Sequence, residues 1–258
     1  MKVVLLAGGL GTRISEETIN KPKPMVEIGG KPILWHIMKI FSFYGYNEFI
    51  VCCGYKGHQI KEYFLNYRSH NSDLTIDISK NSVQLKNNKV SENWKISLID
   101  TGLDTMTGGR IKRISKYLEN DDDFFLTYGD GLANVNINKL LKFHKKHKKI
   151  ATITAVQPVG RYGSLEIVKN NTVNSFFEKP KGDRNWINGG FFILNKKVMN
   201  FINGDKEIFE KKPLENLAKK KQLIAYKHNG FWKAMDTLND RNYLEELISK
   251  NKAPWKIW

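Results

Sequence analysis

The chain is poor in cysteine, which occurs only twice among 258 residues, as the adjacent pair Cys52 and Cys53. Neighbouring residues of a strand point to opposite faces, so these two thiols are not expected to form a disulfide with each other. Two cysteines alone also make a poor zinc site. We therefore expect both to be small, buried side chains in the protein core.

Long apolar runs are absent too. No segment reaches the roughly 18 consecutive apolar residues of a membrane-spanning helix. The apolar stretch after Met1-Lys2 ends at glycines too early to be the core of a signal peptide. A cytoplasmic protein is therefore expected, and its hydrophobic content of 41% allows a sizeable core.

Acidic residues are scarce relative to basic ones, with 26 Asp and Glu against 42 Lys and Arg, which gives a net charge of +16. Such an excess suggests nucleic-acid binding. The lysines are dispersed, however, and neither an aromatic RNA-recognition motif nor zinc-finger spacing is present. We expect a solvated lysine surface without a nucleic-acid or membrane partner, one that attracts anionic small molecules such as nucleotides and sugar phosphates.

The hydrophobic pattern predicts alternating strands and helices in the first part of the chain. Residues 2–9 form a continuously apolar strand, as in parallel sheets, and run into a glycine loop. A helix is expected over 31–46, a strand over 47–55 and a second helix over 56–67. This order predicts the α/β class, with a Rossmann-like open, predominantly parallel mixed sheet flanked by helices.

The later segments contain more strand signals. Residues 68–107 alternate apolar and polar positions, which indicates a small β excursion plus one strand of the main sheet. A hairpin is expected over 162–180 with Asn170-Asn171 at its tip, and the chain is β-rich from about residue 150 onward. Further strands are expected at 123–128, 150–156 and 187–195, and further helices at 108–120, 137–149, 206–222 and 238–251.

The glycine loop "GGLGTR", residues 8–13, fits neither of two common phosphate-binding motifs. It lacks the third glycine of G-x-G-x-x-G and the Gly-Lys-Ser/Thr of the Walker motif. It still presents backbone N–H groups at a strand end, and these can hold phosphate oxygens. Thr12 adds a hydroxyl and Arg13 a guanidinium. From these residues alone, the loop either binds phosphates or is a tight turn with a surface arginine.

Two aspartates follow apolar segments at positions that suit a ligand site. Asp130 comes after "FFLTYG" and Asp236 after "FWKAM", and open α/β sheets bind ligands beyond the carboxyl ends of their strands. Two such carboxylates could share one Mg²⁺ ion, with phosphates and water completing its coordination. Alternatively, each is an ordinary turn or helix-capping aspartate.

The histidines and late tryptophans are expected to be structural. No histidine combines with a serine and a carboxylate as a nucleophilic triad, and His144 and His147, among lysines, are expected at the surface. Trp232, Trp255 and Trp258 either pack into the core or dock on another subunit.

Several motifs together resemble the sugar-1-phosphate nucleotidylyltransferase family. "LAGGLGTR" is followed by "KPKPMVEIGGKP", and alignment on the final Lys31-Pro32 places the family's reactive-site lysine at Lys23 rather than Lys21. "YGDG", "FFEKPK", "INGGFF" and "MDT" are similar to later motifs of the family, in the same order. With "CCGYKG" and "KAPWK", the set is most similar to the members that use CTP and glucose 1-phosphate.

The resemblance implies a single nucleotidyltransferase domain over 1–258, with a nucleotide-binding half of about 1–150 and a sugar-binding half of about 151–258. It implies Mg²⁺-dependent cytidylyl transfer for O-antigen and related lipopolysaccharide synthesis, by a homo-oligomer of up to six chains. The implied catalytic residues are Arg13, Lys23 and Asp130, and the implied metal ligands are Asp130 and Asp236. The implied nucleotide-binding residues are Leu6, Ala7, Gly8, Gly9, Gly11, Thr12, Arg13, Lys23, Arg110 and Gly129. The implied sugar-binding residues are Glu178, Lys179, Asn188, Gly189 and Gly190.

Other functions stay open at this point. The same fold could use UTP or dTTP, or another phosphorylated acceptor, because no spacing rule distinguishes cytosine from other bases. A protein of a different class, a catalytically inactive, basic RNA-binding or regulatory protein, is also an alternative. The presence of Arg13, Lys23, Asp130 and Asp236 favours the enzyme.

Overall fold

A seven-stranded mixed sheet forms the centre of the molecule, in the order β14-β10-β13-β8-β1-β4-β7. Only β13 runs antiparallel to its neighbours β8 and β10, whereas the other described pairs are parallel. This confirms the predicted α/β class and the mixed, mostly parallel sheet. The strands are β1 (Val3–Leu6), β4 (Glu48–Cys53), β7 (Lys95–Asp100), β8 (Asp123–Tyr128), β10 (Ala151–Val156), β13 (Ile187–Asn195) and β14 (Leu223–His228). The computed structural model describes residues 1–87, 92–118, 121–158, 164–177 and 185–258, without the side chains of Arg13, Ser15 and Glu16.

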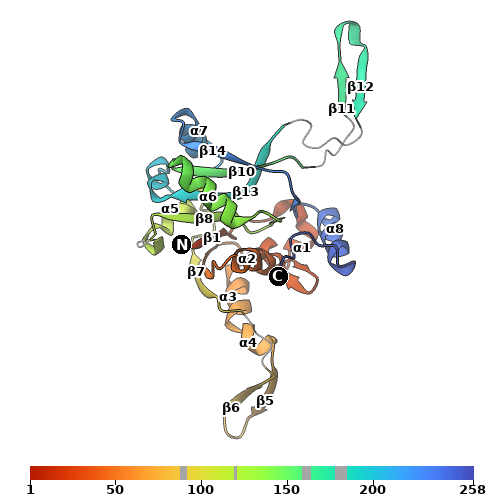
Figure 1. Cartoon of the computed structure of the whole chain (residues 1–258). Helices are drawn as coiled ribbons and strands as arrows, with labels where there is room; N and C mark the ends of the chain where they lie inside the picture. Colours follow the sequence, from red (N-terminus) through yellow and green to blue (C-terminus); the bar gives the residue numbers. More distant parts are fainter. Residues whose placement is uncertain (88–91, 119–120, 159–163, 178–184) are drawn as a thin grey trace.

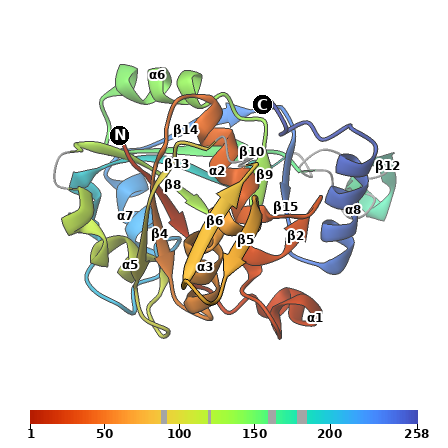
Figure 2. The same ribbon diagram turned by 90° about the horizontal axis from the view of Figure 1, so that it is seen from below.

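Helices cover both faces of the sheet (Figures 1 and 2). In β1, Val3 and Leu5 belong to one buried cluster, while Val4 and Leu6 belong to the other. Because both faces are covered, every side chain of this strand is buried, which explains its continuous apolar run. The first cluster includes residues of α2 (Ile33–Phe43), α3 (Gly57–Leu65), α6 (Ile137–His147) and α8 (Leu238–Ser249), and the second includes residues of α5 (Thr107–Arg113) and α7 (Lys212–Lys219).

Two hairpins stand away from the central sheet (Figure 1). The first pairs β5 (Asp73–Asp77) with β6 (Ser82–Lys86), while β7 joins the main sheet, so the predicted excursion plus main-sheet strand is confirmed. The second pairs β11 (Ser164–Ile167) with β12 (Val173–Phe177). Its tip residues Asn170 and Asn171 both have positive φ, at 64° and 61°, a backbone conformation that asparagine adopts more readily than most residues.

Two helix predictions were too long. The helix expected over 108–120 ends at Arg113, as α5, and a separate 3-10 helix covers Ser115–Leu118. A helix was expected over 206–222, but α7 begins only at Lys212 and ends at Lys219. Pro213 lies in its first turn, where the missing N–H has no intrahelical partner to lose. A helix that began at residue 206 would carry this proline in its interior, where the ring clashes with the preceding turn.

The two segments that carry the candidate metal aspartates pair with each other. β9 (Gly131–Ala133) and β15 (Trp232–Ala234) form a two-stranded antiparallel sheet. The backbone N–H of Met235 also donates to the carbonyl of Asp130 at 2.9 Å. Neither strand was predicted from the hydrophobic pattern, because three-residue strands are too short to show alternation.

Buried aromatic residues attach the C-terminal segment to α2. Trp255 is fully buried, and its ring lies 6.3 Å from that of His36 on α2. The Trp258 ring lies 5.9 Å from the ring of Trp35. For Trp255 the core-packing alternative is therefore confirmed, and Cys52 and Cys53 are buried, free thiols as expected. Among the described residues, no helix combines the length and apolar character needed to cross a membrane.

His144 corrects the expectation of a surface histidine. Its side chain is buried, and its Nδ1 lies 2.7 Å from the hydroxyl oxygen of Thr152. His147 lies at the same distance from that hydroxyl through Nε2 and is half-buried. The neighbouring lysines misled the interpretation, because they lie on the solvent side of α6 while His144 faces the sheet.

We expect acid to destabilise the fold through His36. Burial lowers the pKa of His36 to about 4, below the 6.5 of the unfolded chain. Because the unfolded state binds the proton more tightly, the free energy of unfolding should fall as pH drops from about 6.5 to 4. The loss is up to about 3 kcal/mol. Urea unfolding at several pH values checks this for wild type and for His36→Gln, which should lose much of the slope. The exposed His58→Gln is the control, and an unchanged slope in His36→Gln would contradict the assignment.

Candidate active site

A cavity of about 580 Å³ opens beyond the carboxyl ends of β1 and β8. Its size is typical of small-ligand sites, which span roughly 300–1,000 Å³. Its position is where open α/β sheets bind their ligands. Twelve of the nucleotide-, metal- and sugar-binding residues expected from the sequence line it, namely Leu6, Ala7, Gly8, Gly9, Gly11, Thr12, Lys23, Arg110, Gly129, Asp130, Asn188 and Asp236.

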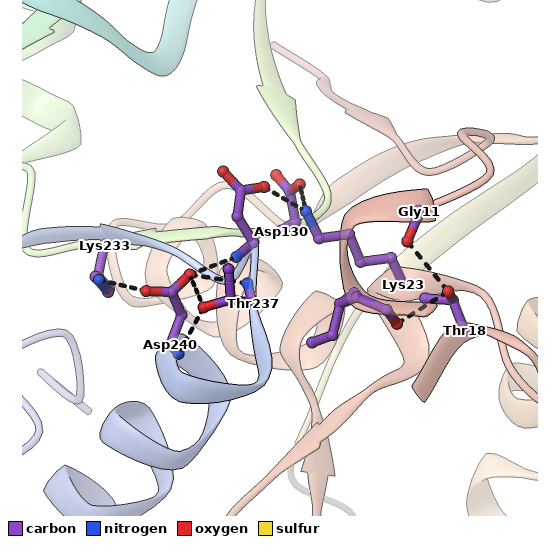
Figure 3. Close-up of polar contacts among 9 residues, drawn as sticks. Gly11, Thr18, Lys23, Asp130, Lys233, Thr237 and Asp240 are labelled. Atoms are coloured by element: carbon purple, nitrogen blue, oxygen red, sulfur yellow. Dashed lines mark hydrogen bonds and ion pairs between the residues drawn. The ribbon is translucent and has the colours of Figure 1, made fainter. Parts of the chain in front are cut away.

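The glycine loop is held closely against the segment that follows it. Gly11 has a φ of +68°, and a Cβ atom there would lie 2.9 Å from the Thr18 methyl and 3.1 Å from Lys23 Cβ. The Thr18 hydroxyl donates to the carbonyls of Gly11 and Ile14 at 3.1 and 3.0 Å (Figure 3). A side chain at position 11 would therefore push the loop away from Lys23, which makes glycine necessary at that position.

Arg110 lies directly beneath this loop and is buried. Its Nη2 donates to the carbonyls of Gly8 and Leu103 at 2.9 and 3.2 Å. Its Nη1 donates to the carbonyls of Cys53 and Gly102 and to the Thr101 hydroxyl, at 2.7–3.1 Å. One guanidinium thus joins three segments, namely the end of β4 and the loops that follow β1 and β7.

Arg110 also places positive charge under the loop. Burial lowers its pKa, but an arginine stays protonated in proteins. It forms no ion pair with any residue in the described part of the chain, since its partners are carbonyls and a hydroxyl. A buried cation without a carboxylate partner favours anions bound above it.

Lys23 bridges the two candidate metal ligands. Its Nζ lies 2.6 Å from Asp130 Oδ2 and 2.7 Å from Asp236 Oδ1. The Lys23 side chain is 8% exposed, whereas the carboxylates are 25% and 21% exposed. Figure 3 shows the ammonium at the end of an extended side chain that points to Asp130. Two aspartates from distant parts of the chain therefore meet around one lysine, which is 107 positions from Asp130 and 213 positions from Asp236 in sequence.

Asp236 is held in place by the helix that follows it. The Asp240 side chain accepts hydrogen bonds from the backbone N–H groups of Asp236 and Thr237, at 3.0 and 2.8 Å, and caps α8 with Thr237. Its other oxygen lies 2.5 Å from Lys233 Nζ (Figure 3). Burial acts to raise the pKa of Asp240, but the hydrogen bonds from Lys233 and Thr237 outweigh it and lower that pKa. Asp240 is thus a positioning residue for Asp236.

The two aspartates fit a shared divalent cation. Both approach one nitrogen within hydrogen-bond distance, so both can reach a single small ion. In the part of the chain described, no cluster of three or more His, Cys, Asp or Glu side chains forms a complete metal site. An ion held here would need further oxygen ligands from phosphates or water, as Mg²⁺ usually does.

A hydrogen-bonded group on the far wall was missed by the sequence analysis. The Tyr128 hydroxyl donates to Glu210 Oε1 at 2.6 Å and accepts from Asn188 Nδ2 at 3.1 Å. Burial, together with the nearby Glu210 carboxylate, raises the pKa of Tyr128 well above its usual range, so the phenol stays protonated. The Thr107 hydroxyl donates to Glu210 Oε2 at 2.6 Å. Tyr128 belongs to the recognised motif "YGDG", although no role was assigned to it, whereas Glu210 lies in "IFEKKP", which matches no motif.

Several sequence-predicted residues lie elsewhere. Gly189 is behind the cavity wall, where its carbonyl accepts from Trp232 Nε1 at 2.7 Å. Gly190 has a φ of +79° and packs against the Tyr128 ring. Neither lines the cavity. The Arg13 side chain and residues Glu178 and Lys179 lie outside the described part of the chain.

The site defines a nucleotide-binding protein of the Rossmann-like class. It combines a glycine loop, a buried lysine and paired carboxylates at one edge of a mixed α/β sheet. The chain belongs to the nucleotidyl transferase family, whose model matches residues 2–246. It is 55% identical to glucose-1-phosphate cytidylyltransferase of Salmonella typhimurium over 258 residues, with both chains fully covered.

Two other similarities agree with this family. A probable glucose-1-phosphate cytidylyltransferase of Bacillus subtilis is 46% identical over 259 residues, again with both chains fully covered. The crystal structure of HddC from Yersinia pseudotuberculosis has a TM-score of 0.69 and 29% identity, covering 96% of this chain and 99% of that one. The family resemblance identified from the motifs is thereby confirmed.

Proposed function

We propose that the chain transfers a cytidylyl group from CTP to α-D-glucose 1-phosphate, giving CDP-glucose and pyrophosphate. The observation that carries the proposal is the full-length 55% identity to a glucose-1-phosphate cytidylyltransferase. The meeting of Lys23, Asp130 and Asp236 in one cavity supports it.

In this reaction a phosphate oxygen of glucose 1-phosphate attacks the α-phosphorus of CTP, and the bond to pyrophosphate breaks. Both reactants are anions, so catalysis depends mainly on positioning and charge neutralisation. Lys23 supplies a buried positive charge for the reacting phosphates. Leu6, Ala7, Gly8, Gly9 and Gly129 lie against the nucleotide, Gly11 and Thr12 hold its outer phosphates, and Arg110 supports the loop.

Asp130 and Asp236 are the proposed Mg²⁺ ligands. Bound there, Mg²⁺ would neutralise phosphate oxygens of the nucleotide. The two carboxylates share Lys23 as their present cationic partner, which offsets only part of their negative charge and leaves the group attractive to a divalent cation.

The remaining assignments follow the family pattern. Arg13 is proposed to hold the departing pyrophosphate. Glu178 and Lys179 are proposed to bind the sugar phosphate, together with Asn188, Gly189 and Gly190. The whole chain is proposed to act as one domain, with the nucleotide bound by its first half and the sugar by its second. Strands of both halves share the central sheet, which supports a single unit.

The biological setting is proposed as cytoplasmic synthesis of CDP-glucose for lipopolysaccharide O-antigen. A homo-oligomer, up to a hexamer, is part of this proposal. The β5–β6 hairpin supports it, because Ile76, Ile78 and Val83 are 61%, 90% and 62% exposed. An isolated hairpin with apolar side chains in water is only marginally stable, so a covering surface on another subunit would stabilise it.

The activity is tested by incubating the protein with Mg²⁺, glucose 1-phosphate and each of CTP, UTP, dTTP and GTP, and measuring pyrophosphate. We expect turnover with CTP to exceed the others by at least about tenfold, and CDP-glucose to be formed. Asp236→Asn is the matched control for contaminating activity and should lose most of the rate. Preference for UTP or dTTP would contradict the cytidylyl assignment. RNA binding without pyrophosphate release would favour the non-enzymatic alternative.

A further inference from the structure

A second cavity, of about 700 Å³, lies at the opposite edge of the sheet from the candidate active site. Strands β8 and β13 reach both cavities. Asp123 and Asn195 line the second one, whereas Tyr128 and Asn188 line the first. Six residues of β8 span about 17 Å, so the two cavities are separate sites.

Five lysines surround this second cavity, which we call the lysine cavity: Lys145, Lys148, Lys149, Lys197 and Lys220. Lys145 and Lys148 lie at the C-terminal end of α6, Lys197 follows β13 and Lys220 follows α7. None of the five forms an ion pair with another residue in the described part of the chain. Positive charge at a helix C-terminus is favourable, but that accounts only for the lysines near the end of α6.

The cavity contains little negative charge to offset these lysines. Its one acidic residue is Asp123, whose Oδ1 accepts from Asn195 Nδ2 at 2.8 Å and lies 3.6 Å from His144 Nε2. That carboxylate is therefore engaged with Asn195 and His144. Like charges gathered around one concave surface repel one another, so the site favours a multiply charged anion as occupant.

The rest of the lining suits a small ligand. The cavity includes the amide side chains of Asn195 and Gln222, which can bond to polar groups. The Phe201 ring forms an apolar part of the wall, and Lys220 Nζ lies 5.2 Å from its centre. The volume lies within the range of small-molecule sites. Ammonium groups are compact charges that bind phosphates.

We propose that the lysine cavity is a second ligand site, which binds a small molecule carrying two or more phosphate groups. This site lies outside the substrate cavity and shares none of its lining residues. The proposal does not depend on which nucleotide the enzyme uses.

Calorimetric titration with inorganic triphosphate tests the site. Wild-type protein should bind triphosphate in the lysine cavity. The triple variant Lys145→Ala, Lys149→Ala, Lys220→Ala should bind triphosphate there at least about tenfold more weakly. The control is a second triple variant, Lys86→Ala, Lys139→Ala, Lys252→Ala, which removes the same charge from exposed lysines elsewhere. This control should bind triphosphate with the wild-type affinity. Both triple variants should retain turnover, which shows that they fold. Equal stoichiometry and affinity in the two variants would overturn the proposal, because only overall charge would then matter.

A second measurement needs no variant. Triphosphate should slow hydrogen exchange in wild-type segments 145–150, 197–202 and 220–223, which carry the lysine cavity. The effect should persist when the substrate cavity is saturated with CTP. Protection confined to segments 6–12 and 128–130 would place triphosphate only in the substrate cavity and would overturn the proposal.

Discussion

Replacement of Lys23 by alanine is expected to lower kcat by about 10²–10³-fold, the usual cost of removing one preorganised charge from a reacting centre. The Lys23 ammonium is the cation nearest to both Asp130 and Asp236 among the described contacts. Without it, two carboxylates face each other uncompensated, which disfavours the approach of two further anions. Steady-state kinetics should show the loss mainly in kcat, with a smaller change in KM for CTP.

Lys21 provides the matched control, because it belongs to the same "NKPKPM" segment. Its ammonium lies 3.8 Å from Glu27 and its side chain is 35% exposed, away from the aspartates. Lys21→Ala should therefore keep near wild-type kcat. Equal losses in the two variants would show that the segment, rather than the Lys23 charge, matters. Circular dichroism should confirm that both variants fold.

Replacement of Arg110 by alanine should destabilise the protein and weaken nucleotide binding together. The change leaves four backbone carbonyls and one hydroxyl without their donor in a buried place. We expect a loss of about 3 kcal/mol in the free energy of unfolding. This corresponds to a decrease in Tm of roughly 6–12 °C for a chain of this size. Thermal unfolding checks the first effect, and KM for CTP, expected to rise, checks the second.

Arg113 is the control for this change, since it lies one helical turn further along the chain. It is exposed and forms two hydrogen bonds to Asp205, at 2.9 and 2.6 Å. Arg113→Ala should lower Tm far less, because exposed ion pairs contribute little. If Arg110→Ala raised KM without any decrease in Tm, the arginine would act on the nucleotide directly rather than by joining three segments of the chain.

The strands and helices of the central sheet were largely predictable from the sequence. The continuous apolar runs of β1 and β4 and the amphipathic pattern of α2 reflect which faces are buried, and burial is a local property of the pattern. The exceptions have local causes too. Pro213 shortened α7, and His144 was buried beside lysines because only one face of α6 contacts the sheet.

The candidate site was only partly predictable. The glycine loop, Lys23 and the two aspartates belong to recognisable motifs, so the sequence named most of the cavity lining. It could not indicate Glu210, because its partners Thr107 and Tyr128 are distant in sequence and no motif contains it. The role of Asp240 did have a local signal, since Asp240 lies three residues after Thr237 in a capping-box pattern, but that signal was not used. The carbonyl partners of Arg110 could not be predicted either, because every residue has a backbone carbonyl and the sequence does not show which of them accept hydrogen bonds.

The sequence by itself therefore determined the α/β class, the family and the identity of the charged groups. Hydrophobic periodicity and sequence motifs depend only on the order of residue types along the chain. Only the tertiary structure decided how those groups meet. The pairing of β9 with β15 brings Asp130 to Asp236, and Lys23, which packs close to the turn at Gly11, forms ion pairs with both. Such contacts depend on distances and hydrogen bonds between segments far apart along the chain, and these exist only once the sheet has formed.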